Sequence, residues 1–154
     1  MEPTETPEQF LFRSFRLLDR GDFDEWLLTC SENVSIVLKS RNNREPLTEI
    51  ALINDDFERL RGRIEQIKRY WHAENPPTRT LHSISNVETE PHSEGLVFVH
   101  SCFTVVATRR NQQDILYGRY QDLLRYGVKG WQLERREAVL ENDIIERGKI
   151  SFIV

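Results

Sequence analysis

Cysteine, long apolar runs and blocks of one charge are all scarce in this sequence. The two cysteines, Cys30 and Cys102, stand far apart in segments with the pattern of secondary structure, so we predict buried thiols and no disulfide. No apolar run is long enough to span a bilayer, and the acidic start, Met-Glu-Pro-Thr-Glu-Thr-Pro-Glu, is unlike a signal peptide. We therefore expect a cytoplasmic protein without a membrane-spanning segment.

Several signatures of enzymes and of nucleic-acid binding are missing too. The chain has no glycine-rich phosphate loop, no nucleophile elbow and no zinc-ligand spacing. Its charges are interspersed, with a formal net charge of −4, so no basic face indicates nucleic acid as a partner. The 154 residues, 38% of them hydrophobic, predict one soluble domain over residues 1–154, with residues 1–5 as a flexible tail.

The first part of the chain predicts two short helices that meet at a corner. Thr6 is expected to cap the first helix, with Gln9 completing a capping box. Gly21 ends this helix, because glycine adopts the left-handed conformation without a steric penalty. Asp22 is then expected to cap a second helix, and a strand follows over residues 34–38.

A third helix is predicted between Asn54 and a pair of prolines. Asn54 is expected to cap it, and apolar residues three and four positions apart give it one buried stripe. Gly62 lies inside this helix, where it either permits close packing or allows a bend. The helix must end before Pro76 and Pro77, because proline has no N–H to donate and restricts the residue before it.

Long strands joined by short turns are predicted for the second half. We expect them over residues 78–90, 96–109, 113–126 and 131–141. A bulge in the first strand would bring its apolar residues, Leu81, Ile84 and Val87, to one face. The apolar end, residues 150–154, is expected at a sheet edge or under a partner subunit, because a free hydrophobic terminus promotes association.

Two motifs are distinctive: Glu-Asn-Pro-Pro-Thr-Arg-Thr at residues 74–80 and Leu-Leu-Asp-Arg-Gly-Asp-Phe-Asp-Glu-Trp-Leu at residues 17–27. Shorter segments accompany them, namely Phe12-Arg13, Gly118-Arg119, Asp122 with Leu124-Arg125, Trp131 with Arg135-Arg136, and the tail at 150–153. Taken in order over nearly the whole chain, these segments resemble the small (β) subunit of bacterial aromatic-ring-hydroxylating dioxygenases. The resemblance implies a component of a multicomponent oxygenase that hydroxylates an aromatic compound to a cis-dihydrodiol. The residues give no indication of which aromatic compound.

The element pattern and the resemblance agree on the fold. Three helices followed by long antiparallel strands predict an α+β domain, with helices packed on one face of a strongly curved, mainly antiparallel sheet. This is the cystatin-like cone of the nuclear transport factor 2 superfamily, and the resemblance implies the same architecture.

The ligands for oxygen-activating iron are too few in this chain. A Rieske centre needs two cysteines and two histidines, and no Cys-x-His or Cys-x-x-His pair is present. Two histidines of an iron triad, His82 and His100, would face each other only if their strands paired in that register; strand histidines with polar partners are the favoured interpretation. The resemblance implies that the Rieske [2Fe–2S] cluster and the mononuclear Fe(II) belong to a separate α subunit, with no cofactor in this chain.

An alternative follows from the same fold. Cones of this kind can enclose a cavity where an Asp/His pair acts as acid and base, as in stand-alone isomerases or dehydratases. The candidates here are His100, which is expected to point inward, Asp19 and Tyr120. Against this, Asp19 is expected to pair with Arg16 or Arg20. Apolar residues are also numerous enough to fill the cone, and they include Leu116, Tyr120 and Leu124 with Phe103 and Val105.

The favoured hypothesis is a non-catalytic subunit that supports assembly. The resemblance implies an α partner, commonly as α3β3, with the β subunits forming a trimer. Candidate interface residues are Asn75, Pro76, Pro77, Arg79 and Phe152. Arg79 is preferred because the rigid proline corner fixes its position, whereas Arg135 and Arg136 either join an interface or pair with strand acids.

Overall fold

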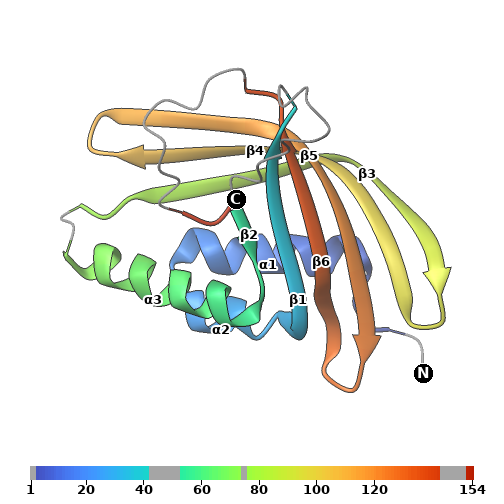
Figure 1. Ribbon diagram of the computed structural model, residues 1–154. Coiled ribbons are helices and arrows are strands. Elements are labelled where there is room, and N and C mark those ends of the chain that lie inside the picture. The colour runs from blue at the N-terminus through green and yellow to red at the C-terminus, as the bar shows by residue number, and fades with distance from the viewer. Residues whose placement is uncertain (1–2, 42–52, 74–75, 143–151) are drawn as a thin grey trace.

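A computed structural model describes residues 3–41, 53–73, 76–142 and 152–154 (Figure 1). These residues form, in chain order, α1 Pro7–Arg20, α2 Phe23–Leu27, β1 Cys30–Ser40, β2 Ile53–Asp55, α3 Phe57–Ala73, β3 Arg79–Ser93, β4 Leu96–Arg109, β5 Gln112–Gly127 and β6 Gly130–Leu140. The predicted helices and strands are confirmed, and β2 is an addition. None of the helices within the described ranges has both the length and the apolar composition to cross a bilayer.

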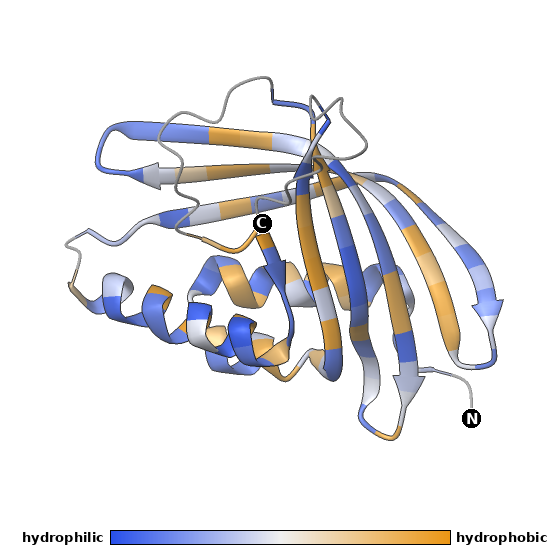
Figure 2. Cartoon of the chain, in the orientation of Figure 1, coloured by the Kyte–Doolittle hydropathy of each residue, from blue (hydrophilic) through white to orange (hydrophobic). Residues whose placement is uncertain are grey.

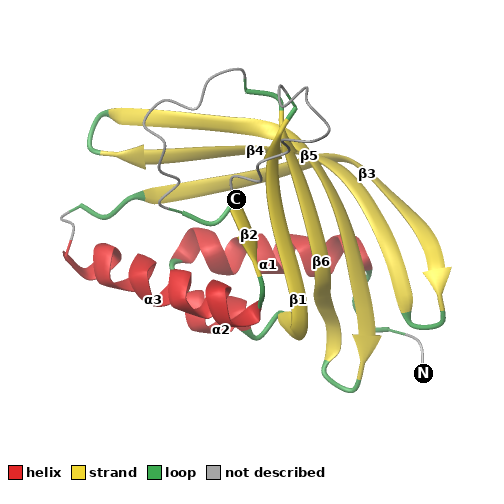
Figure 3. Cartoon of the chain, viewed as in Figure 1, coloured by secondary structure: helices red, strands yellow, loops and turns green. Residues whose placement is uncertain are grey.

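The strands form one mixed sheet in the order β2-β1-β6-β5-β4-β3. Only β1 and β6 among these neighbours run parallel, and the other pairs are antiparallel. The sheet curves around the helices, which lie on its concave side (Figures 1 and 3). The predicted α+β class, with helices packed on a strongly curved, mainly antiparallel sheet, is confirmed.

Local signals at both ends of α1 act as the sequence predicts. The hydroxyl of Thr6 accepts a hydrogen bond from the backbone N–H of Gln9 at 3.1 Å, and the Gln9 side chain accepts one from the Thr6 N–H at 2.9 Å. Gly21 ends the helix with φ of 79°. A Cβ atom there would lie 2.9 Å from the Trp71 ring of α3, so the same glycine also permits close packing of two helices.

Two predicted caps are wrong. Asp22 occupies the N-cap position of α2, but its side chain makes no capping hydrogen bond. Asn54 does not cap α3, because it lies in β2, where Ile53 pairs with Leu38 of β1. The cap is Asp56 instead, whose carboxylate accepts the Arg59 N–H at 2.9 Å. The short strand pairing shifts the start of the helix by two residues.

The predicted bulge of β3 lies between Ser85 and Glu88, where Asn86 has φ of 52°. It brings Ile84 and Val87 to the core side, as expected. The prediction is wrong for Leu81, because no bulge separates it from Ile84 and an odd spacing places the two on opposite faces. Leu81 therefore lies on the convex face and is exposed.

Alternating burial along the strands builds one core between sheet and helices (Figure 2). The core residues from the central strands β4 and β5 are Val99, Phe103, Val105, Ala107, Leu116, Tyr120 and Leu124. The chain terminus enters the same core, because Phe152, Ile153 and Val154 are all buried. Two cavities beside these last residues have volumes of about 30 and 20 Å³, room for about one water molecule each.

Candidate functional site

A guanidinium group occupies the interior of the cone. Arg136 of β6 packs against two aromatic rings, with its Cζ 4.9 Å from the centroid of Phe15 and 4.4 Å from that of Tyr120. Asp122 of β5 accepts hydrogen bonds from Nε and Nη2 of Arg136 at 2.8 and 3.0 Å. Burial alone lowers the pKa of Arg136, but the adjacent carboxylate more than compensates, so this pKa is raised and the group stays charged. The predicted pairing of Arg136 with a strand acid is confirmed.

Stacked rings fill the remaining interior. The Phe15 ring stacks on the rings of His82 and Tyr120, with centroid distances of 5.1 and 5.6 Å. The Tyr120 ring stacks on that of Phe103 with a centroid distance of 4.1 Å. Burial raises the pKa of Tyr120, and its hydroxyl has no hydrogen-bond partner among the described residues. The expectation that Tyr120 and its neighbours fill the cone is confirmed, and the phenol is held neutral at physiological pH.

Asp19 of α1 and His82 of β3 form a partly buried pair. Nδ1 of His82 lies 2.5 Å from Oδ1 of Asp19, which also accepts the Thr80 hydroxyl at 3.0 Å, and Oδ2 of Asp19 accepts the His82 backbone N–H at 3.0 Å. Nε2 lies 2.9 Å from the carbonyl oxygen of Ile153, which can only accept. His82 therefore carries a proton on Nε2 and joins α1, β3 and the C-terminal residues. The expected pairing of Asp19 with Arg16 or Arg20 is wrong.

His100 is placed on the outside of the sheet. The buried positions of β4 are the odd-numbered ones, from Val99 to Ala107, so His100 points away from the helices. It lies 3.5 Å from Glu90 on the convex face. The prediction that His100 points inward is wrong, and with it any acid–base pair of His100 with Asp19 or Tyr120.

The two histidines considered for an iron triad also lie apart. His82 pairs with Val105 across β3 and β4, whereas the strand partner of His100 is Glu88. Within the described ranges, no three His, Cys, Asp or Glu side chains are grouped as metal ligands would be. The described residues therefore do not fit a mononuclear iron site.

The proline corner leads into an exposed region of the convex face. Pro76 and Arg79 are exposed and Pro77 is half-buried, while Asn75 lies outside the described residues. Arg79 makes no ion pair with any described carboxylate, so its guanidinium is available to a partner. Phe152, by contrast, is buried in this chain's own core. The interface role of these residues remains a prediction.

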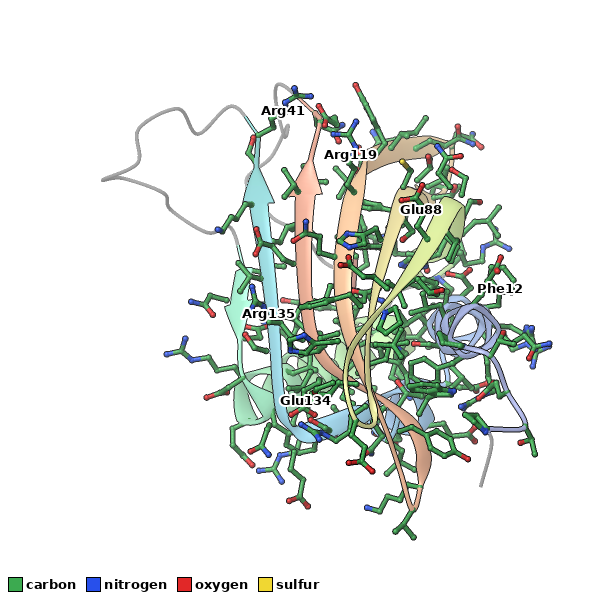
Figure 4. All side chains as sticks on the ribbon, turned by 90° about the vertical axis from the view of Figure 1, so that its right-hand side faces the viewer. Phe12, Arg41, Glu88, Arg119, Glu134 and Arg135 are labelled. Carbon is green, nitrogen blue, oxygen red and sulfur yellow. The ribbon has the colours of Figure 1, made fainter. Side chains whose placement is uncertain are left out.

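An apolar row crosses the convex face next to Arg79. Leu81 on β3 pairs with Val106 on β4, which pairs with Ile115 on β5. Tyr117 follows two residues later on the same face of β5, and Leu81, Ile115 and Tyr117 are all exposed. Figure 4 shows Phe12 on α1, beside β3 at the edge of the sheet.

A groove of about 380 Å³ lies between α1 and the edge strand β3. Its lining comprises Phe12, Phe15, Arg16, Asp19, Arg20, Leu81, His82 and Ile84. The sequence predicts the pieces of this site but not the site itself. Asp19 and Phe15 share one side of the first helix at a spacing of four, and His82 alternates with Ile84 on β3. Their meeting depends on how the helix packs across the sheet.

Comparison with known proteins gives a consistent match over the whole chain. Residues 13–147 match the family described as "Ring hydroxylating beta subunit". The chain is 30% identical to the benzene 1,2-dioxygenase subunit beta of Pseudomonas putida, over 94% of this chain and 85% of that protein.

Two solved structures share the fold. One is the beta subunit of the benzoate 1,2-dioxygenase of Burkholderia mallei, with a TM-score of 0.81 and 25% identity, covering 97% of this chain and 100% of that one. The other is a scytalone dehydratase-like protein of Novosphingobium aromaticivorans, with a TM-score of 0.69 and 21% identity, covering 91% of this chain and 86% of that one. The second likeness concerns the fold alone.

Proposed function

This chain belongs to the ring-hydroxylating beta-subunit family, and from that premise we propose that it acts as a structural subunit with no active site of its own. It is a small subunit of an aromatic-ring-hydroxylating dioxygenase, and its partner in a hetero-oligomer is a large alpha subunit. In the proposed assembly, the Rieske cluster, the mononuclear iron and the substrate pocket belong to the alpha subunit. This chain contributes a rigid surface that positions the alpha subunits.

One observation carries this proposal: the interior of the cone is filled by the Arg136 guanidinium, which is bonded to Asp122 and packed against the rings of Phe15 and Tyr120. The cavities beside the C-terminal residues have volumes of about 30 and 20 Å³. Pockets that bind small organic ligands are roughly ten times larger, at about 300 Å³ or more. The groove of about 380 Å³ between α1 and β3 reaches that size, but it is open to the surface and lies outside this filled interior. A filled interior supports a role in shape and contact, not in turnover.

The proposed stoichiometry is three alpha and three beta subunits, with the beta subunits in contact with one another. The proline corner, Pro76 to Arg79, is proposed to lie at a subunit contact. Two features support this: Arg79 is exposed without a carboxylate partner among the described residues, and the corner before it has little conformational freedom to lose on binding. The relatives named above act on benzene and on benzoate, so the substrate of this system is left open.

The test is co-expression of this chain with the large alpha subunit of its own system. We expect co-purification in equal amounts, Rieske absorbance in the complex, and no turnover by this chain alone. Mass measurement of the complex checks the three-to-three ratio. Arg79→Ala is expected to weaken assembly and Arg110→Ala, at an exposed turn, to leave it unchanged. Failure of the wild-type chain to bind the large subunit would reject the proposal.

A second candidate is an acid–base enzyme, favoured by the short Asp19–His82 contact beside an open groove. Both ring nitrogens of His82 are already engaged, and its side chain is only 1% exposed, so no substrate reaches it without a rearrangement. The discriminating observation is dehydration or isomerisation by the isolated chain that His82→Asn abolishes. If the chain is a structural subunit, the isolated wild type is expected to show no such activity, so His82→Asn has none to remove.

A further inference from the structure

The groove between α1 and β3 exposes apolar side chains on an otherwise well-packed domain. Phe12 is 43% exposed on α1, and Leu81 is 63% exposed on β3. Ile84 and the edge of Phe15 continue the apolar lining. On the far side of Leu81, the row through Val106 to Ile115 extends the same surface across three strands. A contiguous apolar surface of this kind marks a contact site.

The rim of the groove is positively charged and uncompensated. Arg16 and Arg20 are exposed one helical turn apart, a spacing at which like charges repel each other. Neither forms an ion pair with any carboxylate in the described part of the chain, whereas the neighbouring Arg13 binds Glu5 at 2.9 Å. Asp19, the acidic residue of the lining, is already bonded to His82 and Thr80. The groove therefore presents two free guanidinium groups beside an apolar floor.

The shape favours an extended occupant. β3 is the edge strand of the sheet formed by the described residues, so no described strand pairs with its outer edge. A segment in this groove lies along the strand edge, where Asp19 already accepts the His82 N–H, so its binding rests mainly on side chains that reach the apolar lining. We propose that the α1–β3 groove binds an extended segment of the large subunit, in which an apolar side chain is flanked by carboxylates. This inference rests on the proposed function and adds the place and chemistry of the contact.

Among the described residues, no other exposed apolar group of this chain suits the groove, whereas the family to which the chain belongs pairs it with a large alpha subunit. Outside this surface, the exposed large apolar residues within the described ranges are Leu28, Tyr70 and Val128. Tyr70 follows Arg69 and Val128 precedes Lys129, while Leu28 has uncharged neighbours. None of these offers the acidic flank that the two arginines need. Ile115 does adjoin an acid, Asp114, but it belongs to the surface that contains the groove.

The first experiment places a photo-cross-linking residue at position 12 in the co-expressed complex. Irradiation is expected to join this chain to the large subunit. A cross-link to another copy of this chain, or none to the large subunit, would overturn the inference. The same residue placed at exposed position 128 is the control and is expected to give no such product.

The second experiment measures affinity for the large subunit with matched variants. Arg16→Glu with Arg20→Glu, and separately Leu81→Asp, are expected to weaken binding by about tenfold or more. Arg69→Glu on α3 and Leu28→Asp are the controls at exposed positions, and both are expected to leave affinity unchanged. Equal melting temperatures of all isolated variants will show that folding is intact.

The outcomes separate this inference from the function on which it rests. If the wild-type chain does not bind the large subunit, both the groove inference and the proposed function are rejected. If the wild-type chain binds the large subunit and the groove variants bind it as tightly as the control variants do, the groove is rejected as the contact site and the proposed function stands. Raising the salt concentration supplies a further check. Salt screens the electrostatic contribution of Arg16 and Arg20 to binding, so the difference in affinity between the wild type and the double variant is expected to decrease.

Discussion

Asp122 and Arg136 form a fully buried ion pair, with side chains 0% and 1% exposed and two hydrogen bonds of 2.8 and 3.0 Å between them. The pair joins adjacent strands at the Asp122–Arg136 register position of β5 and β6. It also lies against the ring of Phe15 on α1. The burial of this ion pair thus depends on the sheet and the helix being correctly packed.

Removing one partner of this pair is expected to destabilise the domain strongly. Asp122→Ala leaves a buried guanidinium without its carboxylate and should lower the free energy of unfolding by about 3–5 kcal/mol. Replacing both residues, as Asp122→Leu with Arg136→Met, should recover much of this loss. Urea denaturation of the isolated chain measures both. Disruption of the surface pair Arg125–Glu134 is the control, at about 1 kcal/mol or less; a similarly small loss for Asp122→Ala would contradict the prediction.

His82 is expected to hold the C-terminal residues in place. His82→Ala removes the contacts to Asp19 and to the Ile153 carbonyl, and should cost about 1–3 kcal/mol. The last residues should then become more sensitive to carboxypeptidase, followed by mass spectrometry. His100→Ala on the convex face is the matched control and should change neither quantity. Equal digestion rates for the two variants would show that the histidine does not restrain the terminus.

Two glycines predict opposite responses to alanine. A Cβ atom at Gly118 would lie 1.9 Å from the carbonyl oxygen of Val139, so Gly118→Ala must push β5 from β6 and should cost about 3 kcal/mol or more. Gly62 in α3 has no atom within 4 Å of the added methyl, so close packing does not explain it. Gly62→Ala should stabilise the helix by about 1 kcal/mol. Melting temperatures should move in opposite directions, and a common direction would contradict the argument.

Alkaline pH is expected to weaken the fold through Cys30. Burial raises the pKa of this thiol from 9.0 to about 12, so the unfolded chain loses the thiol proton at a lower pH than the folded one. Stability is therefore nearly unaffected below about pH 8 and falls as the pH rises toward 12, with a loss of about 1.4 kcal/mol at pH 10. Denaturation at pH 8 and 10 tests this. Cys30→Ala should flatten the pH dependence, whereas Cys102→Ala should leave it as in the wild type.

Local chemistry made the helices and strands predictable. Thr6 and Gly21 bound α1 through contacts within a few residues of sequence, and such contacts need no knowledge of the fold. The two wrong caps have a different origin. Asn54 is a good capping residue by itself, but pairing of β2 with β1 claims it for a strand. Tertiary pairing overrode a local preference.

The site was less predictable, because strand faces were ambiguous. Around His100, both alternating sets of β4 contain large apolar residues, with Phe98 on one face and Val99 and Phe103 on the other. Sequence alternation alone could not decide which set faces the helices. The contact of Asp19 with His82 spans 63 residues of sequence and depends on the packing of α1 on β3. By contrast, the hypothesis for Arg79 rests on the proline corner, which is a local feature; Arg79 is exposed, and its interface role stays a prediction.

The guanidinium that packs against Phe15 and Tyr120 also restrains the longitudinal position of α1. A helix on a uniformly apolar surface can slide by a turn at little cost, but here a one-turn displacement would remove Phe15 from the buried charge of Arg136. Phe12, Arg16 and Arg20 therefore stand at invariant heights above β3. Any protein that docks on them meets a surface whose spacing is determined from inside the domain.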